Sequence, residues 1–273
     1  MVNSDYKLVF MGTPDFSVEF LRRLKAGGIS PDLIITQPDK PQGRKMELCS
    51  PPAKVWGESN GVLVWQPEKA RNEDFLDKLR EFKPDLILTA SYGQILPQVL
   101  LDIPRFGCLN VHPSLLPLYR GAAPVQASII AGDKITGVTV MIMEAGLDSG
   151  PILAQREYLV TEDITAGELL LDLACVGAEI VLEVLPQYLE GEIEARKQDD
   201  AQATYAGRLD RETGKIDWSK SAREVHNLVR GTQPWPGAYT YYEGKRLKIM
   251  ASVVADDSVC TAFRLGCVLQ PMR

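Results

Sequence analysis

Residues 6–24 read YKLVFMGTPDFSVEFLRRL, a short apolar run followed by a turn and an amphipathic segment. The apolar run predicts a buried strand that ends at Gly12. In the turn, Thr13 can cap a helix and Pro14 suits the first helical position. The apolar residues after the turn recur at helical spacing, namely Phe16, Phe20, Leu21 and Leu24. The stretch therefore predicts a strand, a tight turn and a helix that packs back on the strand.

The same alternation continues along the chain. Further strands are predicted at residues 32–36, 62–64, 85–89, 107–110 and 137–143, and helices at about 70–82 and 165–191. The second of these helices opens with Thr165-Ala-Gly-Glu168, a capping box. Alternating strands and helices predict an α/β fold with a doubly wound, mostly parallel, Rossmann-like sheet. Ligands bind such sheets at the carboxyl ends of strands, which here carry residues 12–14, 91–93, 110–112 and the segment before Asp148.

A change of composition near residue 207 indicates a second domain. We expect a first domain over residues 1–190, a linker over 191–206 and a shortened, β-rich C-terminal domain over 207–273. Within the last domain, a helix is expected at about 219–230 and a hairpin around residues 243–245. Residues 37–54 are rich in Pro, Gly, Lys and Arg and predict a long mobile loop.

The composition restricts the class of protein. The chain has 273 residues, five scattered cysteines, two histidines and a formal charge of −6. This pattern argues against a disulfide framework, a zinc site and a binder that relies on bulk positive charge. No apolar run approaches the roughly 20 residues that a membrane span needs, and residues 1–5 lack signal-peptide features. We expect a cytoplasmic protein without a metal, which contacts nucleic acid only through local basic patches.

The densest cluster of reactive side chains follows residue 108. Asn110 and His112 are two residues apart, so on an extended strand both side chains point to the same side. An amide donor beside an imidazole suits the oxyanion of an acyl-transfer intermediate, and the carboxylate of Asp148 can orient the ring or move a proton. Taken alone, the three residues also fit ordinary turns and a buried histidine. Cys108 and Ser114 are nearby nucleophiles, but neither has an evident base.

The segment Asn110-Val-His-Pro-Ser-Leu-Leu-Pro117, followed by Tyr119-Arg-Gly121, resembles the signature of formyltransferases that use 10-formyltetrahydrofolate. The loop with Asp148 resembles their partner motif. The resemblance implies that Asn110, His112 and Asp148 are catalytic and that no metal takes part. It also implies folate contacts at Tyr92, Gly93, Ile95, Ser114, Leu115, Leu116 and Pro117.

Three further segments are similar to the branch of that family that acts on methionyl-tRNA. They cover residues 10–16, residues 36–44, and residues 227–230 with 234–238, and the resemblance is expected to run from about residue 6 to about 250. It implies that the partners are the folate co-substrate and methionyl initiator tRNA. We expect a monomer, although the sequence itself does not reveal the oligomeric state. The implied contacts to tRNA or methionine are Thr13, Pro14, Asp15, Phe16, Lys40, Arg44 and Lys45.

Two features depart from the family pattern. Gly207-Arg208 stands where the family has proline and lysine, for which we expect a modest effect. Residues 251–273 do not resemble the rest of the family's barrel domain, so we expect an incomplete domain that packs on the first or is partly disordered. Arg120 is expected to tie its loop to the sheet, although it can also reach a phosphate, and His226 is expected to be structural.

Other functions remain open at this point. One is another folate-dependent formyltransferase, acting on a purine precursor or an amino sugar nucleotide, because the three catalytic residues do not separate these substrates. A second is a dinucleotide-binding oxidoreductase, but the turn at residues 12–15 lacks the G-x-G-x-x-G pattern. A third is a non-catalytic relative that binds folate and has lost productive tRNA docking.

Overall fold

The computed structural model describes residues 6–42 and 46–255. Its main sheet has seven strands in the order β10-β9-β7-β6-β1-β2-β5. These are β1 (Leu8–Gly12), β2 (Leu33–Ile35), β5 (Leu63–Trp65), β6 (Leu86–Ala90), β7 (Cys108–His112), β9 (Ile135–Ile142) and β10 (Ile152–Leu159). The first five are parallel, whereas β9 and β10 run antiparallel to their neighbours. The predicted doubly wound, mostly parallel sheet is confirmed.

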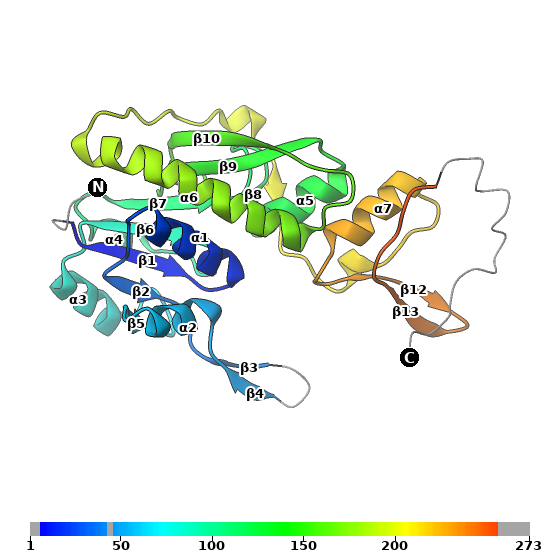
Figure 1. Cartoon of the computed structure of the whole chain (residues 1–273), viewed down its shortest axis with the longest axis horizontal. Coiled ribbons are helices and arrows are strands. Elements are labelled where there is room, and N and C mark those ends of the chain that lie inside the picture. The colour runs from blue at the N-terminus through cyan, green and yellow to red at the C-terminus, as the bar shows by residue number, and fades with distance from the viewer. Residues whose placement is uncertain (1–5, 43–45, 256–273) are drawn as a thin grey trace.

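Helices cover both faces of this sheet (Figure 1). They are α1 (Asp15–Ala26), α2 (Pro52–Ser59), α3 (Glu73–Phe82), α4 (Gln98–Leu101), α5 (Pro124–Ala131) and α6 (Ala166–Glu190). A further helix, α7 (Ala222–Gly231), lies in the C-terminal part and packs on α5. The capping box of Thr165 opens α6 as predicted. None of the helices in the described part of the chain combines the length and the apolar character that a membrane span requires.

The strands are buried on both faces, and alternate residues pack into two separate cores. On one face, Phe10 and Val111 pack with the apolar sides of α1 and α6. On the other face, Met11 and Cys108 pack with the apolar sides of α3 and α4. Continuous burial of this kind is what parallel strands covered by helices require, and it explains why β1 and β6 are apolar at almost every position.

The turn between β1 and α1 differs from the sequence-based expectation. Pro14 is the residue that precedes α1, and no side chain caps the helix. The hydroxyl of Thr13 instead donates to the carbonyl of Tyr92 at 3.0 Å. The hydroxyl of Ser17 stabilises the same turn. It accepts the N–H of Thr13 at 2.9 Å and donates to the carbonyl of Ala90 at 2.7 Å. The capping prediction was wrong because Thr13 joins the ends of β1 and β6 instead.

Residues 37–42 and 46–54 form regular structure where a mobile loop is predicted. They contain an antiparallel ribbon of β3 (Lys40–Gln42) and β4 (Glu47–Cys49), followed by α2. The base of the ribbon is fixed by Asp39, whose carboxylate accepts from Lys54 at 2.8 Å and from Gln66 at 2.7 Å. The ribbon therefore projects from the body of the molecule as a defined arm (Figure 1).

The described C-terminal residues form α7 and a hairpin of β12 (Ala238–Tyr242) and β13 (Lys245–Ile249), both as predicted. The side chain of Arg230 donates to the carbonyls of Thr161 and Ile164, at 3.1 and 3.2 Å, and His226 Nε2 lies 3.1 Å from the carbonyl of Glu162. His226 is thus a buried contact of α7 with the loop before α6, which agrees with its predicted structural role.

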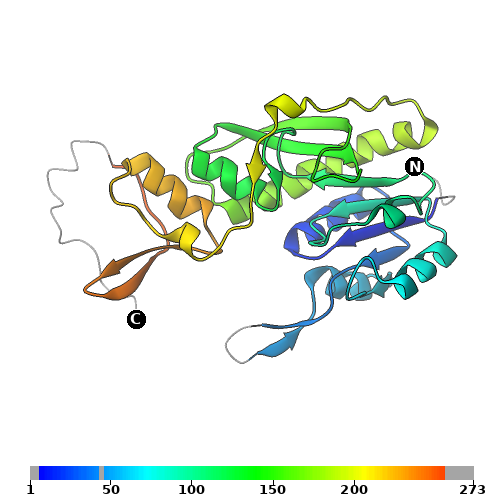
Figure 2. The ribbon, with the colours of Figure 1, turned by 180° about the vertical axis from the view of Figure 1, so that it is seen from behind.

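The segment expected as a linker returns along the sheet after α6 before it enters the C-terminal part (Figure 2). It pairs with β10 at Arg196, forms the short helix η1 (Asp200–Gln202), and then adds β11 (Tyr205–Ala206) in parallel to β8 (Arg120–Gly121). A second short helix, η2 (Glu212–Gly214), precedes α7. Residues 196–206, called here the return segment, therefore contact the first domain along their length.

Candidate active site

The end of β7 places two polar side chains on one face of the sheet. Leu109 and Val111 point into the core beneath α6, so Asn110 and His112 point to the opposite face, as their two-residue spacing predicts. His112 is nearly buried, with 4% of its surface exposed, whereas Asn110 is half-buried. The pair therefore presents one amide and one imidazole to the same limited space.

The amide of Asn110 has a defined orientation. The hydroxyl of Thr89, on the neighbouring strand β6, lies 2.8 Å from Oδ1 of Asn110 and 3.1 Å from the carbonyl of Leu109, and its one proton serves one of these acceptors at a time. The amide nitrogen lies 3.5 Å from Oδ1 of Asp148. Because a carboxylate only accepts, the nitrogen faces Asp148 and the oxygen faces Thr89, so Asn110 turns its N–H groups to the site.

The ring of His112 also has a defined tautomer. Its Nε2 atom lies 3.0 Å from the backbone carbonyl of Tyr119. A carbonyl oxygen only accepts, so Nε2 carries a proton and donates. Nδ1 is the nitrogen left to exchange a proton, and it lies 3.7 Å from Oδ2 of Asp148. Nδ1 is therefore the ring atom of His112 that faces the carboxylate of Asp148.

Asp148 reaches the site by a different route from the one the sequence suggested. The strand before it, β9, runs antiparallel to β7, so the rule about carboxyl ends of parallel strands does not apply. The loop after β9 turns back, and Asp148 adopts a left-handed conformation with φ of 49°. Its Oδ2 accepts the backbone N–H of Gly121 at 2.8 Å. The expected convergence of the three side chains is present, but this loop produces it.

Arg120 contacts the return segment and not the sheet to which it was expected to bind. Its Nη2 atom donates to Gln198 Oε1 and to Asp200 Oδ1, both at 2.7 Å. Gln198 in turn donates to the carbonyls of Asp148 and Gly150, at 2.9 and 2.7 Å. The sequence does not predict this role of Gln198, because no motif or periodicity distinguishes a glutamine within an expected linker.

The predicted folate-binding residues after β6 have very different exposures. Ile95 is 89% exposed, which is unusual for a large apolar side chain. Tyr92 is buried in the core beneath α3, and burial raises the pKa of its phenol to about 12. Its backbone carbonyl accepts from Thr13 and from Gln37, both at 3.0 Å. Gly93 has a φ of 85°, which glycine adopts without strain.

The predicted folate-binding residues after His112 form a closely bonded loop. The hydroxyl of Ser114 is buried and donates to the carbonyl of Leu118 at 2.6 Å. The N–H of Leu116 donates to Thr139 Oγ1 at 3.0 Å, and the Leu116–Pro117 bond is cis. Leu115 is half-buried over Gly137. Any folate contact by Ser114 or Leu116 must therefore use backbone atoms, because these side chains are buried within the protein.

The predicted tRNA-binding or methionine-binding residues divide into three groups. Pro14 and Asp15 are exposed beside the half-buried Thr13, whereas Phe16 is fully buried in the core. Lys40 is exposed on β3, where its ammonium donates to Gln37. Arg44 and Lys45 lie outside the described residues, so their role stays a prediction.

Neither of the nearby nucleophiles is available for catalysis. Cys108 is buried, and burial raises the pKa of its thiol to about 12. Thiolate formation at neutral pH is therefore strongly disfavoured. The Ser114 hydroxyl already donates to a carbonyl. The geometry favours direct transfer between bound substrates over a covalent enzyme intermediate.

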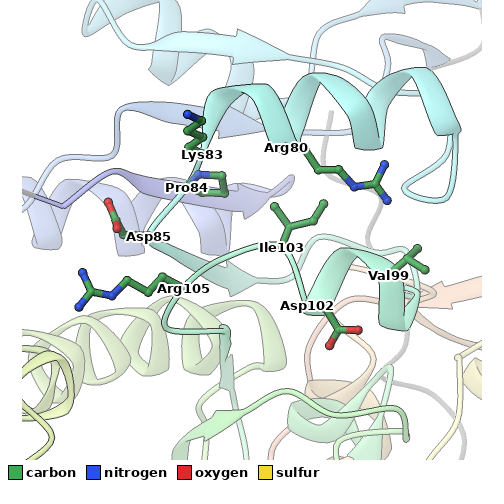
Figure 3. Close-up of a pocket in the computed structure, with 8 residues that line it drawn as sticks. All are labelled: Arg80, Lys83, Pro84, Asp85, Val99, Asp102, Ile103 and Arg105. Atoms are coloured by element: carbon green, nitrogen blue, oxygen red, sulfur yellow. The ribbon is translucent and has the colours of Figure 1, made fainter.

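A pocket is present at the opposite edge of the sheet, near the amino ends of β6 and β7 (Figure 3). Charged side chains line much of it, namely Arg80, Lys83, Asp85, Asp102 and Arg105. None of the residues predicted for catalysis or folate binding lines this pocket. Within residues 6–42 and 46–255, no group of three or more His, Cys, Asp or Glu side chains is arranged to hold a metal ion.

Comparison with known proteins agrees with this geometry. A formyl transferase family model matches residues 6–185, and a model for the formyl transferase C-terminal domain matches residues 208–268. The chain belongs to the formyltransferase family. It is therefore a transferase, and its resemblance to the family continues past residue 250, where we had expected it to end.

Individual members of the family are also similar. A methionyl-tRNA formyltransferase from Acetivibrio thermocellus is 48% identical over 251 residues, which cover 92% of this chain and 81% of that protein. A 4-N formyltransferase from Francisella tularensis has the same fold, with 20% identity, a TM-score of 0.70 and coverage of 92% and 98%. An N-formyltransferase from Helicobacter canadensis, in complex with folinic acid and dTDP-3-aminofucose, has 19% identity, a TM-score of 0.68 and coverage of 90% and 86%. At these identities the two structures show the fold of this formyltransferase alone.

Proposed function

We propose that this formyltransferase moves the formyl group of 10-formyltetrahydrofolate to the amino group of methionyl initiator tRNA. The convergence of Asn110, His112 and Asp148 carries the chemical part of the proposal. The substrate is inferred from the 48% identity to a curated methionyl-tRNA formyltransferase over most of both chains. We further propose that the protein acts as a cytoplasmic monomer.

The reaction needs stabilisation of a tetrahedral intermediate. The methionine amine forms a bond to the formyl carbon, and the carbonyl oxygen becomes an oxyanion. The N–H groups of Asn110 face the site, because the amide nitrogen lies toward the carboxylate of Asp148 and the amide oxygen lies toward Thr89. Protonated His112 can donate from Nδ1, because Nε2 already donates to Tyr119. Two donors aimed at the developing charge are the usual means of lowering such a barrier.

The reaction also needs transfer of one proton. The attacking amine loses a proton, and the leaving folate nitrogen gains one as its bond to the formyl carbon breaks. Asp148 is placed for this role beside Nδ1 of His112, and it keeps a fixed position through the N–H of Gly121. We therefore assign Asp148 both the orientation of His112 and the movement of the proton, directly or through water.

Ile95 supports the folate part of the proposal. An isolated, fully exposed isoleucine on a loop at the carboxyl end of β6 is well suited to pack against a planar ring system. Tyr92 and Gly93 then act through their backbone, since the tyrosine ring is buried. The loop at residues 114–117 is assigned to the same folate site, with Ser114 and Leu116 acting through backbone atoms because their side chains are buried.

The β3–β4 ribbon supports the tRNA part of the proposal. It carries Lys40, and the adjacent Arg44 and Lys45 add two more positive charges in sequence. A basic arm on a protein with a net charge of −6 is a local site for phosphate contact. Asp15, exposed at the start of α1, is assigned a contact with methionine or tRNA.

A transfer assay tests the proposal. The full chain is incubated with 10-formyltetrahydrofolate and methionyl initiator tRNA, and formylmethionine is measured after the ester bond is hydrolysed. Uncharged tRNA and free methionine serve as controls, and an amino sugar nucleotide tests the alternative substrate class. Formylation of methionyl-tRNA is the expected result. Transfer to the sugar nucleotide alone, or folate binding without transfer to any acceptor, would overturn the proposal.

A further inference from the structure

The return segment holds the loop of Asp148 through one buried side chain. Gln198 is 6% exposed, and both polar atoms of its side chain are hydrogen-bonded. Its Nε2 donates to the carbonyls of Asp148 and Gly150, at 2.9 and 2.7 Å. These two carbonyls lie on either side of Ser149, so one amide fixes both ends of the short turn that presents the carboxylate.

Arg120 determines which way this amide points. Its Nε and Nη2 atoms donate to Gln198 Oε1 at 3.1 and 2.7 Å. A guanidinium only donates, so the amide oxygen must face Arg120 and the amide nitrogen must face the two carbonyls. The orientation of Gln198 is therefore enforced by a buried charge, and Asp200 offsets that charge at 2.7 Å.

Asp148 needs such support. Its φ of 49° is a conformation that non-glycine residues seldom adopt. Such residues persist only where the surrounding contacts over-determine them. The carboxylate is held by Gly121, but Gln198 donates directly to the backbone carbonyl of Asp148 itself. The left-handed turn thus depends on a side chain 50 residues further along the chain.

We propose that Gln198 is a positioning residue that keeps the carboxylate of Asp148 against the ring of His112. This inference rests on the proposed function, in which that pair acts in formyl transfer. The side chain of Gln198 is buried and both its polar atoms are bonded to Arg120 and to the Asp148 loop, so it has no polar atom left to contact substrate. Its effect is on the geometry of the pair.

Two variants of the full chain and one control separate this role from general stability. Gln198→Met keeps the length of the side chain without any hydrogen bond. Gln198→Glu keeps the acceptor for Arg120 but places an oxygen against two carbonyls. Gln202→Met is the control, since Gln202 is an exposed glutamine of the same segment that bonds only to Asp199 in the described residues.

Steady-state kinetics give the first measurement. Misplacement of a catalytic group by about 1 Å can slow a reaction about 100-fold. We expect kcat to fall about 10-fold to 100-fold in both Gln198 variants, with the KM for each substrate within about two-fold of the original value. Gln202→Met should match the original protein. An unchanged kcat in Gln198→Met, or a rise in KM alone, would overturn the proposal.

The imidazole signals give a second measurement that does not depend on activity. The sequence contains two histidines, so nitrogen NMR of the ring yields two sets of signals, which a His226→Gln variant assigns. The signals of His112 should move in Gln198→Met while those of His226 remain. Unmoved His112 signals would overturn the positioning role even if kcat fell. If the unchanged protein formylates no acceptor but the signals still move, the proposed function has failed and the structural link stands.

Discussion

Nδ1 of His112 lies 3.7 Å from Oδ2 of Asp148, and that same oxygen accepts the N–H of Gly121 at 2.8 Å. The carboxylate is therefore fixed by backbone before any substrate arrives. The ring is fixed in the same way, by the carbonyl of Tyr119. Groups held in place in advance need no reorganisation during the reaction, which is the condition for effective electrostatic catalysis.

Replacement of Asp148 by asparagine should remove the charge and keep the fold. Asparagine tolerates the left-handed conformation and retains an acceptor for Gly121. We expect kcat to fall by about 100-fold to 10,000-fold, the range seen when a carboxylate that orients a histidine is neutralised. Single-turnover formylation measures the loss. Glu144→Gln, an exposed carboxyl in the same loop, is the control and should retain the original rate.

Replacement of Thr89 by valine should release the amide of Asn110. The hydroxyl of Thr89 lies 2.8 Å from the amide oxygen of Asn110 and 3.1 Å from the carbonyl of Leu109, so without it the amide oxygen loses a partner and the amide can turn. We expect kcat to fall about ten-fold, with a loss of unfolding free energy of about 1 kcal/mol for the buried hydrogen bond. Thr89→Ser restores the donor and should recover most of the rate. Equal rates in the valine and serine variants would contradict a role for this bond.

Replacement of Gly121 by alanine should disturb both the site and the fold. Gly121 has a φ of 119°, and an added Cβ would lie 2.5 Å from the carbonyl oxygen of Ala206. The variant must therefore break the pairing of β8 with β11 and shift the N–H that holds Asp148. A loss of about 2–4 kcal/mol in unfolding free energy is expected, together with a large loss of activity. Gly207→Ala, where the space is open, should leave both properties unchanged.

Replacement of Ile95 by serine tests the folate contact. The side chain is 89% exposed, so its loss should not affect the thermal unfolding midpoint. We expect the KM for 10-formyltetrahydrofolate to rise about five-fold to 20-fold, as for the loss of one apolar ligand contact, with little change in the KM for tRNA. Val99→Ser provides the comparison, since Val99 is 50% exposed but lies on the pocket at the opposite edge of the sheet. Equal folate KM values in the two variants would place the pterin elsewhere.

The thiol of Cys108 should not react with alkylating reagents in the folded protein. Burial raises the pKa of its thiol to about 12, so the neutral form persists throughout the pH range in which the protein is handled. Peptide mapping after brief alkylation at pH 8 should show Cys108 unmodified in the native protein and modified after unfolding. Cys108→Ala should retain formyl transfer. Rapid native alkylation accompanied by loss of transfer would reopen the question of a covalent intermediate.

Much of the fold follows from local patterns. The apolar strands, the helical spacing after Gly12, the capping box at Thr165 and the two-residue turn at Glu243-Gly244 are each specified by neighbouring residues. The placement of Asn110 and His112 on one face follows in the same way from their spacing along β7. These features were predicted correctly because strand and helix periodicity are properties of short segments.

The predictions that were wrong concern features that depend on contacts between distant segments of the chain. Thr13 does not cap α1 because it bonds to Tyr92, which lies 79 residues away. The sequence predicts a mobile loop at residues 37–54 because a short ribbon between polar residues has little apolar periodicity. The direction of β9 was missed because strand direction depends on pairing, which a single segment does not encode.

The sequence alone determined the alternating strands and helices, the pair at the end of β7 and the resemblance to formyltransferases. Only the tertiary structure decided how Asp148 reaches that pair, because an antiparallel strand, a left-handed turn and a glutamine 50 residues away act together there. Hydrogen bonds between distant segments form once the chain has packed, so neither spacing nor composition reveals them. The catalytic side chains can be recognised from their motif, whereas the residues that hold them in place are defined by the folded chain.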